Sequence, residues 1–434
     1  MSRIRRFWKY LIPVCLIAVL ALSVLAIDMF YLSQNQAKVM LTPYVGVAFG
    51  GNTVVDAKLL IDRVKNYTNL FVLDSGRNAI SRNQSSVEEI CDYAVSKGLS
   101  IIINLGINDV LEPNETTWFW HQQLNITKQR WTDLWGNKFL GIYYNDEPGG
   151  IQLDGNWSRW FRYWGERLNQ ISNNINSTFR PLSDDLYQIY LKMWDAMKNG
   201  TQTQDYDLEA KFFVQDVLKI DPGLVALNSA GITAYTSDYS LYWWDYLGGY
   251  DVLFTQLGWN NSVAEQIALV KGAARLQGKD WGAIITWKYD SAPYLDSGDQ
   301  IYNQMLVSYQ AGAKYISVFN YPYDEENEYG AMTDGQFISL QRFWSDINRK
   351  SFADLSVPQA VLVLPKDFGW GMRNPNDTIW GFWTTDDRTQ QIAIVTSKLL
   401  AKYGVGLDIV YYDVVYPITN VAYRNVYYWN STDV

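Results

Sequence analysis

The stretch FLGIYYNDEPGG, residues 139–150, changes abruptly from apolar and aromatic residues to Asn145, Asp146 and Glu147, followed by a proline and two glycines. Its continuous apolar part is typical of a parallel strand buried on both faces. Acids at the end of such a strand either form a solvated turn or are delivered to an active site. The neighbouring segments of the chain distinguish these two interpretations.

Similar apolar runs recur along the chain, with stretches of helical or loop character between them. They lie at 44–50, 69–76, 99–106, 139–146, 224–232, 251–259, 281–289 and 313–322. One intervening amphipathic segment, 86–97, begins with Ser86 followed three residues later by Glu89, a capping-box pattern. Eight buried strands alternating with helices predict an α/β fold, a (β/α)8 TIM barrel over residues 43–352. An open doubly wound sheet is the alternative.

Two segments go beyond a minimal barrel. The connection 151–223 is long, rich in tryptophan and helical in pattern, and it follows the fourth predicted strand. An insertion there lies at the carboxyl-terminal face of the strands, where it can form a wall of a cleft. The second segment, 357–434, has a strand–helix–strand pattern and predicts a small α/β domain of flavodoxin-like type.

The sequence of residues 1–36 indicates the cellular compartment of the protein. Arg3, Arg5, Arg6 and Lys9 precede an apolar run over 10–27, which is about the minimum length for a membrane-spanning helix. Such a segment predicts a single-pass anchor with the basic cluster in the cytoplasm and the remaining chain outside the cell membrane. A cleaved signal peptide, and hence a secreted protein, is the alternative.

Ten N-glycosylation sequons agree with export of the chain. They begin at Asn66, Asn83, Asn114, Asn125, Asn156, Asn176, Asn199, Asn260, Asn376 and Asn430. This density predicts a glycoprotein of a eukaryotic secretory route or of an archaeal surface. The chain has only two cysteines, one of them inside the apolar N-terminal run, so no disulfide framework is expected.

Composition excludes several kinds of chemistry. A net charge of −9 argues against a nucleic-acid partner. The single histidine, His121, lies in a polar region, and we interpret it as a surface residue. The chain lacks a phosphate-binding loop, a dinucleotide fingerprint and a cysteine–histidine metal cluster, so we expect no cofactor and no metal. The 19 tryptophans and 31 tyrosines, with many carboxylates and amides, are the residues that a sugar site uses.

Acidic residues follow the predicted strands, where a barrel places its catalytic groups. They are Asp74, Asp146, Glu147, Asp290, Asp324, Glu325 and Glu326. Glycoside hydrolysis needs one carboxyl group that protonates the leaving oxygen and a second that attacks or activates water. We therefore expect Asp146 or Glu147 to act with a partner from the seventh or eighth strand.

Aromatic and polar side chains near the same strand ends complete a predicted sugar site. Sugar rings stack their C–H faces on aromatic side chains, while polar groups bind their hydroxyls. The predicted substrate-binding residues are Asn145, Tyr144, Trp259, Trp287, Lys288, Tyr289, Tyr321 and Glu325. Gly149 and Gly150 would let a ligand approach the backbone closely. The expected partner is thus a carbohydrate, and the oligomeric state is left open.

The predicted barrel resembles the retaining glycoside hydrolases of clan A, whose strand four ends in Asn followed by the acid/base Glu and whose strand seven ends in a nucleophilic Glu. The phrases MLVSYQAGAKYISVFNYP (305–322) and VPQAVLVLPKDFGWGMRNPNDTIWGFW (357–383) resemble glycoside hydrolase family 42, the beta-galactosidase family. The resemblance implies that Glu147 is the acid/base, with Asp146 as second choice. Asp290 is the acid nearest to the nucleophile's position, and Glu325 or Glu326 is the alternative.

This sequence departs from that pattern at two places. Asp146 separates Asn145 from Glu147, and WKYD (287–290) contains no glutamate. The first hypothesis is therefore a membrane-anchored extracellular glycoside hydrolase, with Glu147 as general acid and Asp290 as base or nucleophile. The second hypothesis is a non-catalytic surface glycoprotein that binds glycans or builds a cell-surface layer.

Overall fold

The computed structural model describes residues 42–74, 80, 83–104, 124–154, 188, 191, 204–219, 221–259, 261–321 and 329–432. The chain divides into two compact units, Met1–Thr42 and Pro43–Val434, and the description below concerns the second. The expected anchor over 1–36, His121 and Glu325 lie outside the described residues. Within the described ranges, no helix combines the length and the apolar character needed to cross a membrane.

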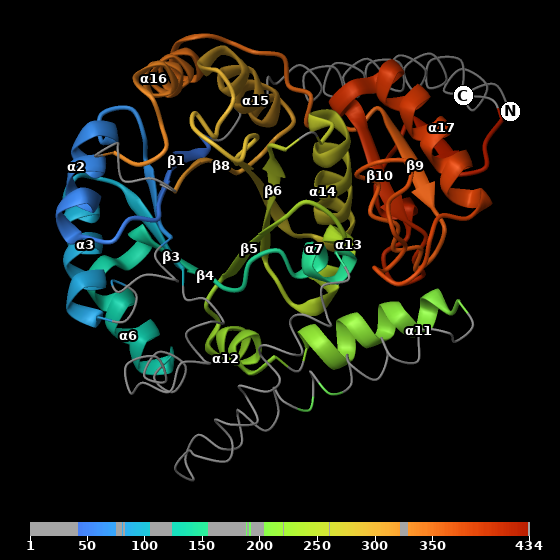
Figure 1. Ribbon diagram of the computed structural model, residues 1–434, viewed down its shortest axis with the longest axis horizontal. Coiled ribbons are helices and arrows are strands. Elements are labelled where there is room, and N and C mark those ends of the chain that lie inside the picture. The colour runs from blue at the N-terminus through green and yellow to red at the C-terminus, as the bar shows by residue number, and fades with distance from the viewer. Residues whose placement is uncertain are drawn as a thin grey trace, which may run out of the picture. The chain divides into compact units, whose positions relative to one another are not determined.

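Eight parallel strands close into a barrel in chain order (Figure 1). They are β1 (Tyr44–Phe49), β2 (Leu70–Leu73), β3 (Ser100–Asn104), β4 (Phe139–Tyr143), β5 (Ala234–Asp238), β6 (Val252–Leu257), β7 (Asp280–Ile285) and β8 (Tyr315–Asn320). The ring is closed where β1 pairs with β8, in a register that runs from Tyr44 opposite Tyr315 to Phe49 opposite Asn320. This closure confirms the predicted (β/α)8 barrel and excludes the open sheet.

The fifth strand was predicted at the wrong place. The apolar run 224–232 belongs to a helix, α12 (Pro222–Ala230), which ends at Gly231 in the left-handed conformation. The helix begins there because the Asp221 side chain accepts hydrogen bonds from two backbone N–H groups of its first turn. The true strand, β5, has the sequence AYTSD. All five of its residues are buried, including the polar Thr236, Ser237 and Asp238.

Helices surround the barrel in Figure 1. They are α2 (Val54–Val64), α3 (Gln84–Ser96), α6 (Leu124–Trp135), α7 (Pro148–Leu153), α11 (Tyr206–Lys211), α12, α13 (Tyr242–Gly248), α14 (Val263–Gln277), α15 (Gly298–Gln310) and α16 (Asp334–Arg349). The π-helix η4 (Phe212–Leu218) continues α11, and the 3-10 helix η2 (Gly136–Lys138) precedes β4. The expected capping box at Ser86 is wrong, because α3 begins earlier and the Asn83 side chain accepts from the Ser86 N–H at 3.2 Å.

The barrel interior is a packed core. Its buried residues are Ala48, Leu70, Val72, Ile102, Tyr143, Tyr235, Val252, Phe254, Ile284 and Tyr315. The rings of Tyr235 and Tyr315 meet edge to face with centroids 5.4 Å apart, and their hydroxyls are hydrogen-bonded at 3.1 Å. Because large aromatic side chains fill these layers, a ligand can reach only the mouth of the barrel.

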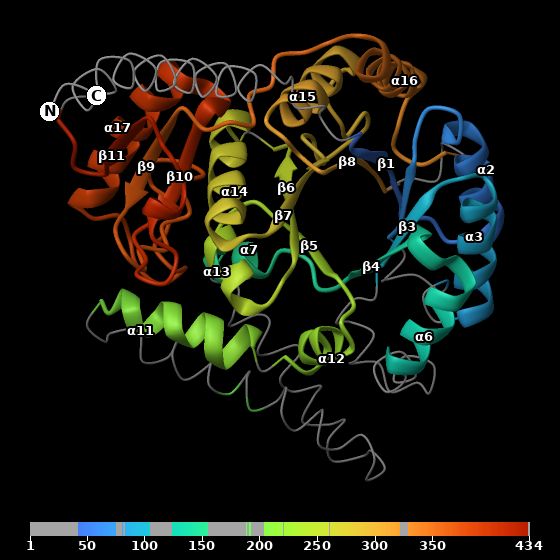
Figure 2. The ribbon, with the colours of Figure 1, turned by 180° about the vertical axis from the view of Figure 1, so that it is seen from behind.

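A second sheet follows the barrel. It has three parallel strands in the order β10-β9-β11, formed by β9 (Ala360–Leu364), β10 (Leu407–Tyr411) and β11 (Asn425–Tyr428) (Figure 2). The helix α17 (Asp387–Tyr403) joins β9 to β10, and the short 3-10 helices η5 (Gly404–Gly406) and η6 (Ile418–Asn420) lie in its connections. This is an α/β unit as expected, while its flavodoxin-like character stays a prediction.

A buried ion cluster joins this sheet to the barrel. Lys271 in α14 is 1% exposed, and its Nζ lies 3.2 Å from Oδ1 of Asp408, which is fully buried in β10. Arg275 Nε contacts the other carboxylate oxygen at 2.7 Å, and the Tyr423 hydroxyl donates to the same oxygen at 3.0 Å. At Gly272 a Cβ would lie 2.5 Å from the Ile409 carbonyl oxygen. Glycine at this position therefore lets the backbones of α14 and β10 approach closely.

Four sequon asparagines have described side chains, and all four are exposed: Asn66, Asn83, Asn376 and Asn430. The side chains of the other six, Asn114, Asn125, Asn156, Asn176, Asn199 and Asn260, lie outside the described residues. Glycosylation of these positions stays a prediction.

Candidate active site

The opening stretch forms β4, a strained loop and α7. Asn145 and Glu147 both have φ of 54°, the left-handed region that costs a non-glycine residue about 1–2 kcal/mol. Two contacts with β5 hold this loop. The Glu147 N–H donates to the Ser237 carbonyl at 3.0 Å, and the Thr236 hydroxyl donates to the Asn145 carbonyl. Glu147 therefore occupies the N-cap of α7 in a position set by the neighbouring strand.

The Glu147 carboxyl group is partly buried and carries an altered proton affinity. Gln256, the last inward residue of β6, donates from Nε2 to Glu147 Oε1 at 2.6 Å. Burial raises the pKa of Glu147 to about 8, and the negative charge of Asp146 adds to this effect, while the Gln256 hydrogen bond opposes it. At neutral pH Glu147 is therefore protonated.

Asp146 has a different environment from its neighbour. It is exposed, and its Oδ1 accepts from the Tyr143 hydroxyl at 2.5 Å and from the Ser237 hydroxyl at 3.0 Å. Gln256 Nε2 donates to Ser237 Oγ at 2.8 Å and so connects this acceptor to Glu147. Two adjacent carboxyl groups with opposed environments are the arrangement that acid–base chemistry requires.

A third carboxyl group reaches the same mouth from β2. Asp74, which follows β2 directly, accepts a hydrogen bond from Asn104 Nδ2 at the end of β3. Burial raises the pKa of the Tyr143 hydroxyl, and the charges of both Asp146 and Asp74 raise it further, which places both carboxylates near that hydroxyl. The acids that the structure brings together thus follow strands two and four.

A buried carboxylate under the site fixes the start of α7. Asp238, the last residue of β5, accepts from the N–H groups of Gly149 at 2.6 Å, Gly150 at 3.0 Å, Tyr239 at 2.7 Å and Ser240 at 3.2 Å. The two glycines allow the close packing of this turn against Tyr239, Ser240 and Leu241. Their expected role in the approach of a ligand stays a prediction. A Cβ at Gly150 would lie 2.3 Å from Tyr239 Cζ. Burial raises the pKa of Asp238 to about 7.

The far end of α7 packs against the segment between β9 and α17. Gln152 Nε2 donates to the Trp380 carbonyl at 2.9 Å, and Arg373 contacts Asp154 at 2.6 Å. Ser240 Oγ donates to the Gly371 carbonyl at 3.0 Å.

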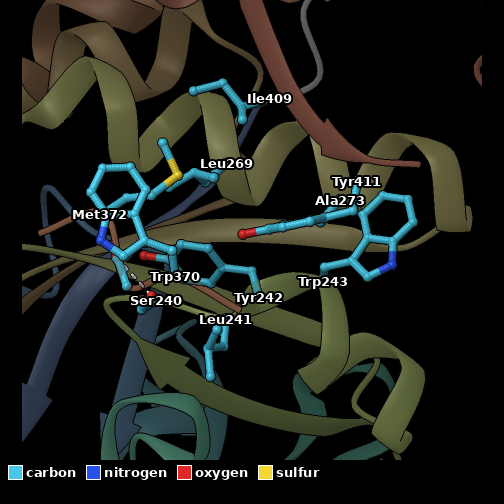
Figure 3. A pocket seen from close by; sticks show the side chains of 11 residues that line it. Ser240, Leu241, Tyr242, Trp243, Leu269, Ala273, Trp370, Met372, Ile409 and Tyr411 are labelled. Carbon is cyan, nitrogen blue, oxygen red and sulfur yellow. Dashed lines mark hydrogen bonds between the residues drawn. The ribbon is translucent and has the colours of Figure 1, made fainter. Parts of the chain in front are cut away.

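The contact region between the barrel and the segment after β9 encloses a cavity of only about 10 Å³. Figure 3 shows Trp370 and Met372 beside Leu269, and Tyr411 beside Trp243. A space of this size is at the limit for one water molecule. This contact region is therefore tightly packed. It supports the site and is not a ligand pocket.

The expected partner on strand seven is not in place. Asp290 is exposed in the loop after β7, and the charges that raise the pKa of Glu147 come from Asp146, Asp238 and Asp154. Lys288 contacts a different acid, Asp296, at 2.8 Å. Among the described residues, the segment that follows β7 therefore supplies no carboxylate to Glu147.

Two of the predicted binding residues, Tyr144 and Asn145, contact the buried Asp221. Tyr144 is 2% exposed and its hydroxyl donates to buried Asp221 at 2.8 Å, so our assignment of this tyrosine to substrate is wrong. The Asn145 side chain also bonds to Asp221 and lowers the pKa of that carboxyl against the raising effect of burial. Both side chains support the fold, because their strand-end positions point outward from the barrel toward the residues before α12.

The remaining aromatic candidates lie along the other side of the mouth. Trp287 packs against Tyr321 with ring centroids 6.3 Å apart, and Tyr321 stacks on Phe319 at 5.8 Å. Trp259 and Tyr289 are exposed by 39% and 45%. The structure thus places an aromatic wall at β7 and β8, while the acids come from β2 and β4.

Five site residues were not among those predicted to act: Asp74, Asn104, Tyr143, Ser237 and Gln256. Of these, the sequence indicated only Asp74 as an acid at a strand end. Their shared property is an inward position near the carboxyl ends of consecutive strands, which strand alternation would have indicated once the register was known.

Comparisons with known proteins add little beyond the fold. No family model matches the chain, and no curated protein is similar enough in sequence to match it. The chain is similar to alpha-L-fucosidase isoenzyme 2 from Paenibacillus thiaminolyticus, with 8% identity, a TM-score of 0.41, and 85% of this chain and 58% of that chain covered.

Two further solved structures show how broad this similarity is. A beta-mannanase from the blue mussel Mytilus edulis has 9% identity and a TM-score of 0.37, with 72% of this chain and 95% of that chain covered. An HpcH/HpaI aldolase from Desulfitobacterium hafniense has 12% identity and a TM-score of 0.29, with 64% and 86% covered. Similarities this low carry no argument about chemistry and do not single out family 42. That argument rests on the site.

Proposed function

We propose that this protein is a glycoside hydrolase in which Glu147 is the general acid. The observation that carries the proposal is the pair formed by Glu147 and Asp146. Glu147 holds its proton at neutral pH because burial and the Asp146 charge raise its pKa to about 8. Asp146 accepts from the hydroxyls of Tyr143 and Ser237 beside it.

In the proposed reaction Glu147 donates its proton to the glycosidic oxygen as the bond from that oxygen to the anomeric carbon breaks. Asp146 takes the second role and accepts a proton from the water that attacks the anomeric carbon. Asp74 stabilises the positive charge that develops on the sugar ring, and Trp287 and Tyr321 supply an apolar face for the ring. One hydroxyl group is formed on each product. Asp146 then releases its proton to solvent and Glu147 takes one up, so both groups return to their starting states.

The location is also part of this proposal. We infer that an N-terminal anchor holds the enzyme at the cell membrane with the barrel outside. This inference rests on the basic cluster followed by the apolar run over 10–27, and on the ten sequons. The exposed positions of Asn66, Asn83, Asn376 and Asn430 are compatible with glycans.

A screen for new reducing ends tests the proposed function. We expect the full-length protein to release reducing sugar from at least one member of a panel of β-glucans, mannans, galactans, xylans and N-acetylglucosamine polymers. The assay belongs near pH 6.5, because Glu147 is then protonated. A panel that stays uncleaved at this pH, with protein that is folded by circular dichroism, would contradict the proposal.

One observation favours a second candidate, a barrel that binds glycans without cleaving them. The segment after β7 continues as Thr286 and Trp287, and no described residue there places a carboxylate at Glu147. The two candidates differ in a simple way. A binding protein retains glycan affinity in Glu147→Gln and releases no reducing ends, whereas the enzyme loses turnover in that variant.

A further inference from the structure

A pocket of about 380 Å³ lies beside the barrel mouth and shares no residue with the Glu147 site. Its walls come from the loop after β6, the loop after β7 and the first turns of α15. The lining residues are Gly258, Trp259, Asn261, Val263, Lys288, Asp296, Gln300, Asn303 and Gln304. The volume falls within the about 300–1,000 Å³ of small-molecule sites.

Trp259 gives this pocket an aromatic surface. The side chain is 39% exposed, and its backbone has φ of 47°, a conformation that is unfavourable for a tryptophan. Its N–H donates to the Trp287 carbonyl at 2.9 Å, so the loop after β7 holds it in this conformation. A large apolar ring kept exposed under backbone strain is better explained by a ligand than by packing.

The polar wall has an acceptor without a donor. Asp296 is 5% exposed, and its two oxygens accept from Lys288 Nζ at 2.8 Å and Gln304 Nε2 at 3.3 Å. The other atom of the same amide, Gln304 Oε1, is buried and has no hydrogen-bond partner among the described residues. An unpaired buried acceptor costs free energy. The other amide side chains of the pocket lining belong to Asn261, Gln300 and Asn303.

The charge of the pocket selects among ligands. Lys288 and Asp296 neutralise each other, so the Lys288 cation is already paired and does not call for an acidic sugar. The pocket lining contains an exposed indole and several side-chain amides, which suit the C–H face and the hydroxyls of an uncharged ring.

We propose that this pocket binds one neutral pyranose unit of a glycan, stacked on Trp259 with its hydroxyls directed to the side-chain amides of the pocket wall. The class of ligand follows the proposed function, because both sites would engage the same glycan. Binding at Trp259 does not require cleavage at Glu147.

Saturation-transfer NMR on the full-length protein tests the proposal. The probes are the methyl β-pyranosides of glucose, galactose, mannose and N-acetylglucosamine, with methyl glucuronoside as the charged comparison. The protein is held in a detergent without a sugar headgroup and is made in a host that adds no N-glycans, because Asn260 begins a sequon next to Trp259.

We expect saturation transfer to at least one neutral pyranoside and little to the glucuronoside. Trp259→Ala should weaken the binding at least about tenfold, and Trp259→Phe should restore part of it. Tyr428→Ala, which removes another exposed aromatic ring at 48% exposure, is the matched control and should leave binding unchanged.

The outcome is independent of the catalytic proposal, because Glu147→Gln should keep this binding. Turnover that is insensitive to Glu147→Gln would overturn the proposed function and leave the Trp259 site standing. No transfer to any of the neutral pyranosides, or equal transfer in the wild type and Trp259→Ala, would overturn the pocket proposal.

Discussion

Replacing Glu147 with glutamine is expected to lower kcat/KM for glycans by about 10²–10⁴-fold, the usual contribution of a general acid. The loss should be much smaller for a 2,4-dinitrophenyl glycoside, because that leaving group departs without a proton. Glutamine keeps an oxygen that can accept from Gln256 Nε2, so the left-handed loop and the start of α7 should be preserved. Steady-state kinetics on the two kinds of substrate provide the measurement.

The comparison variants make this result specific. Asp299→Asn changes a carboxylate whose side chain is 88% exposed and paired with Arg342, so it should leave both rates unchanged. Asp290→Asn should also have little effect, because the structure leaves Asp290 in solvent. Equal losses of Glu147→Gln on the two substrates would show that Glu147 does not protonate the leaving group.

The largest effect on stability is expected at the junction of α14 and β10. Asp408→Ala should lower the free energy of unfolding by about 3–5 kcal/mol, the range for breaking a buried ion pair. The substitution leaves the Lys271 ammonium group buried without its carboxylate, and burial already lowers the pKa of this lysine. Urea unfolding followed by circular dichroism measures the loss.

Two further variants separate burial from charge. Lys271→Met combined with Asp408→Leu should be more stable than Asp408→Ala, because no fully buried lysine is then left without its carboxylate, while Arg275 is partly exposed to solvent. Glu89→Ala breaks an exposed pair with Lys58 and should cost no more than about 1 kcal/mol. An Asp408→Ala loss as small as that of Glu89→Ala would contradict the buried cluster.

The barrel could be predicted because most of its strands are continuous apolar runs buried on both faces. The prediction failed at β5 for a physical reason. Thr236, Ser237 and Asp238 are polar, yet they are buried because the loop before α7 and its first turn use their hydrogen-bonding groups. The apolar run before them instead forms α12, and periodicity alone does not distinguish a buried helix from a buried strand.

Only the part of the site at the end of β4 could be predicted from the sequence. Glu147 follows an apolar strand, which indicated an acid at the barrel mouth. Its neighbours Gln256 and Ser237 are ordinary polar residues within strands, and their importance comes from the hydrogen bonds that link them to Tyr143. That proximity depends on the register of the barrel, which local pattern does not reveal.

The most direct test of the account is the proton affinity of Glu147 itself. Side-chain carboxyl resonances of ¹³C-labelled glutamate can be followed by NMR from pH 4 to pH 10, with Glu147→Gln used to assign the signal. A carboxyl in a buried site beside Asp146 should lose its proton near pH 8, so general-acid activity should fall as the pH rises through that value. A Glu147 midpoint near 4.5, the ordinary value for glutamate, would contradict the claim that this residue is the proton donor.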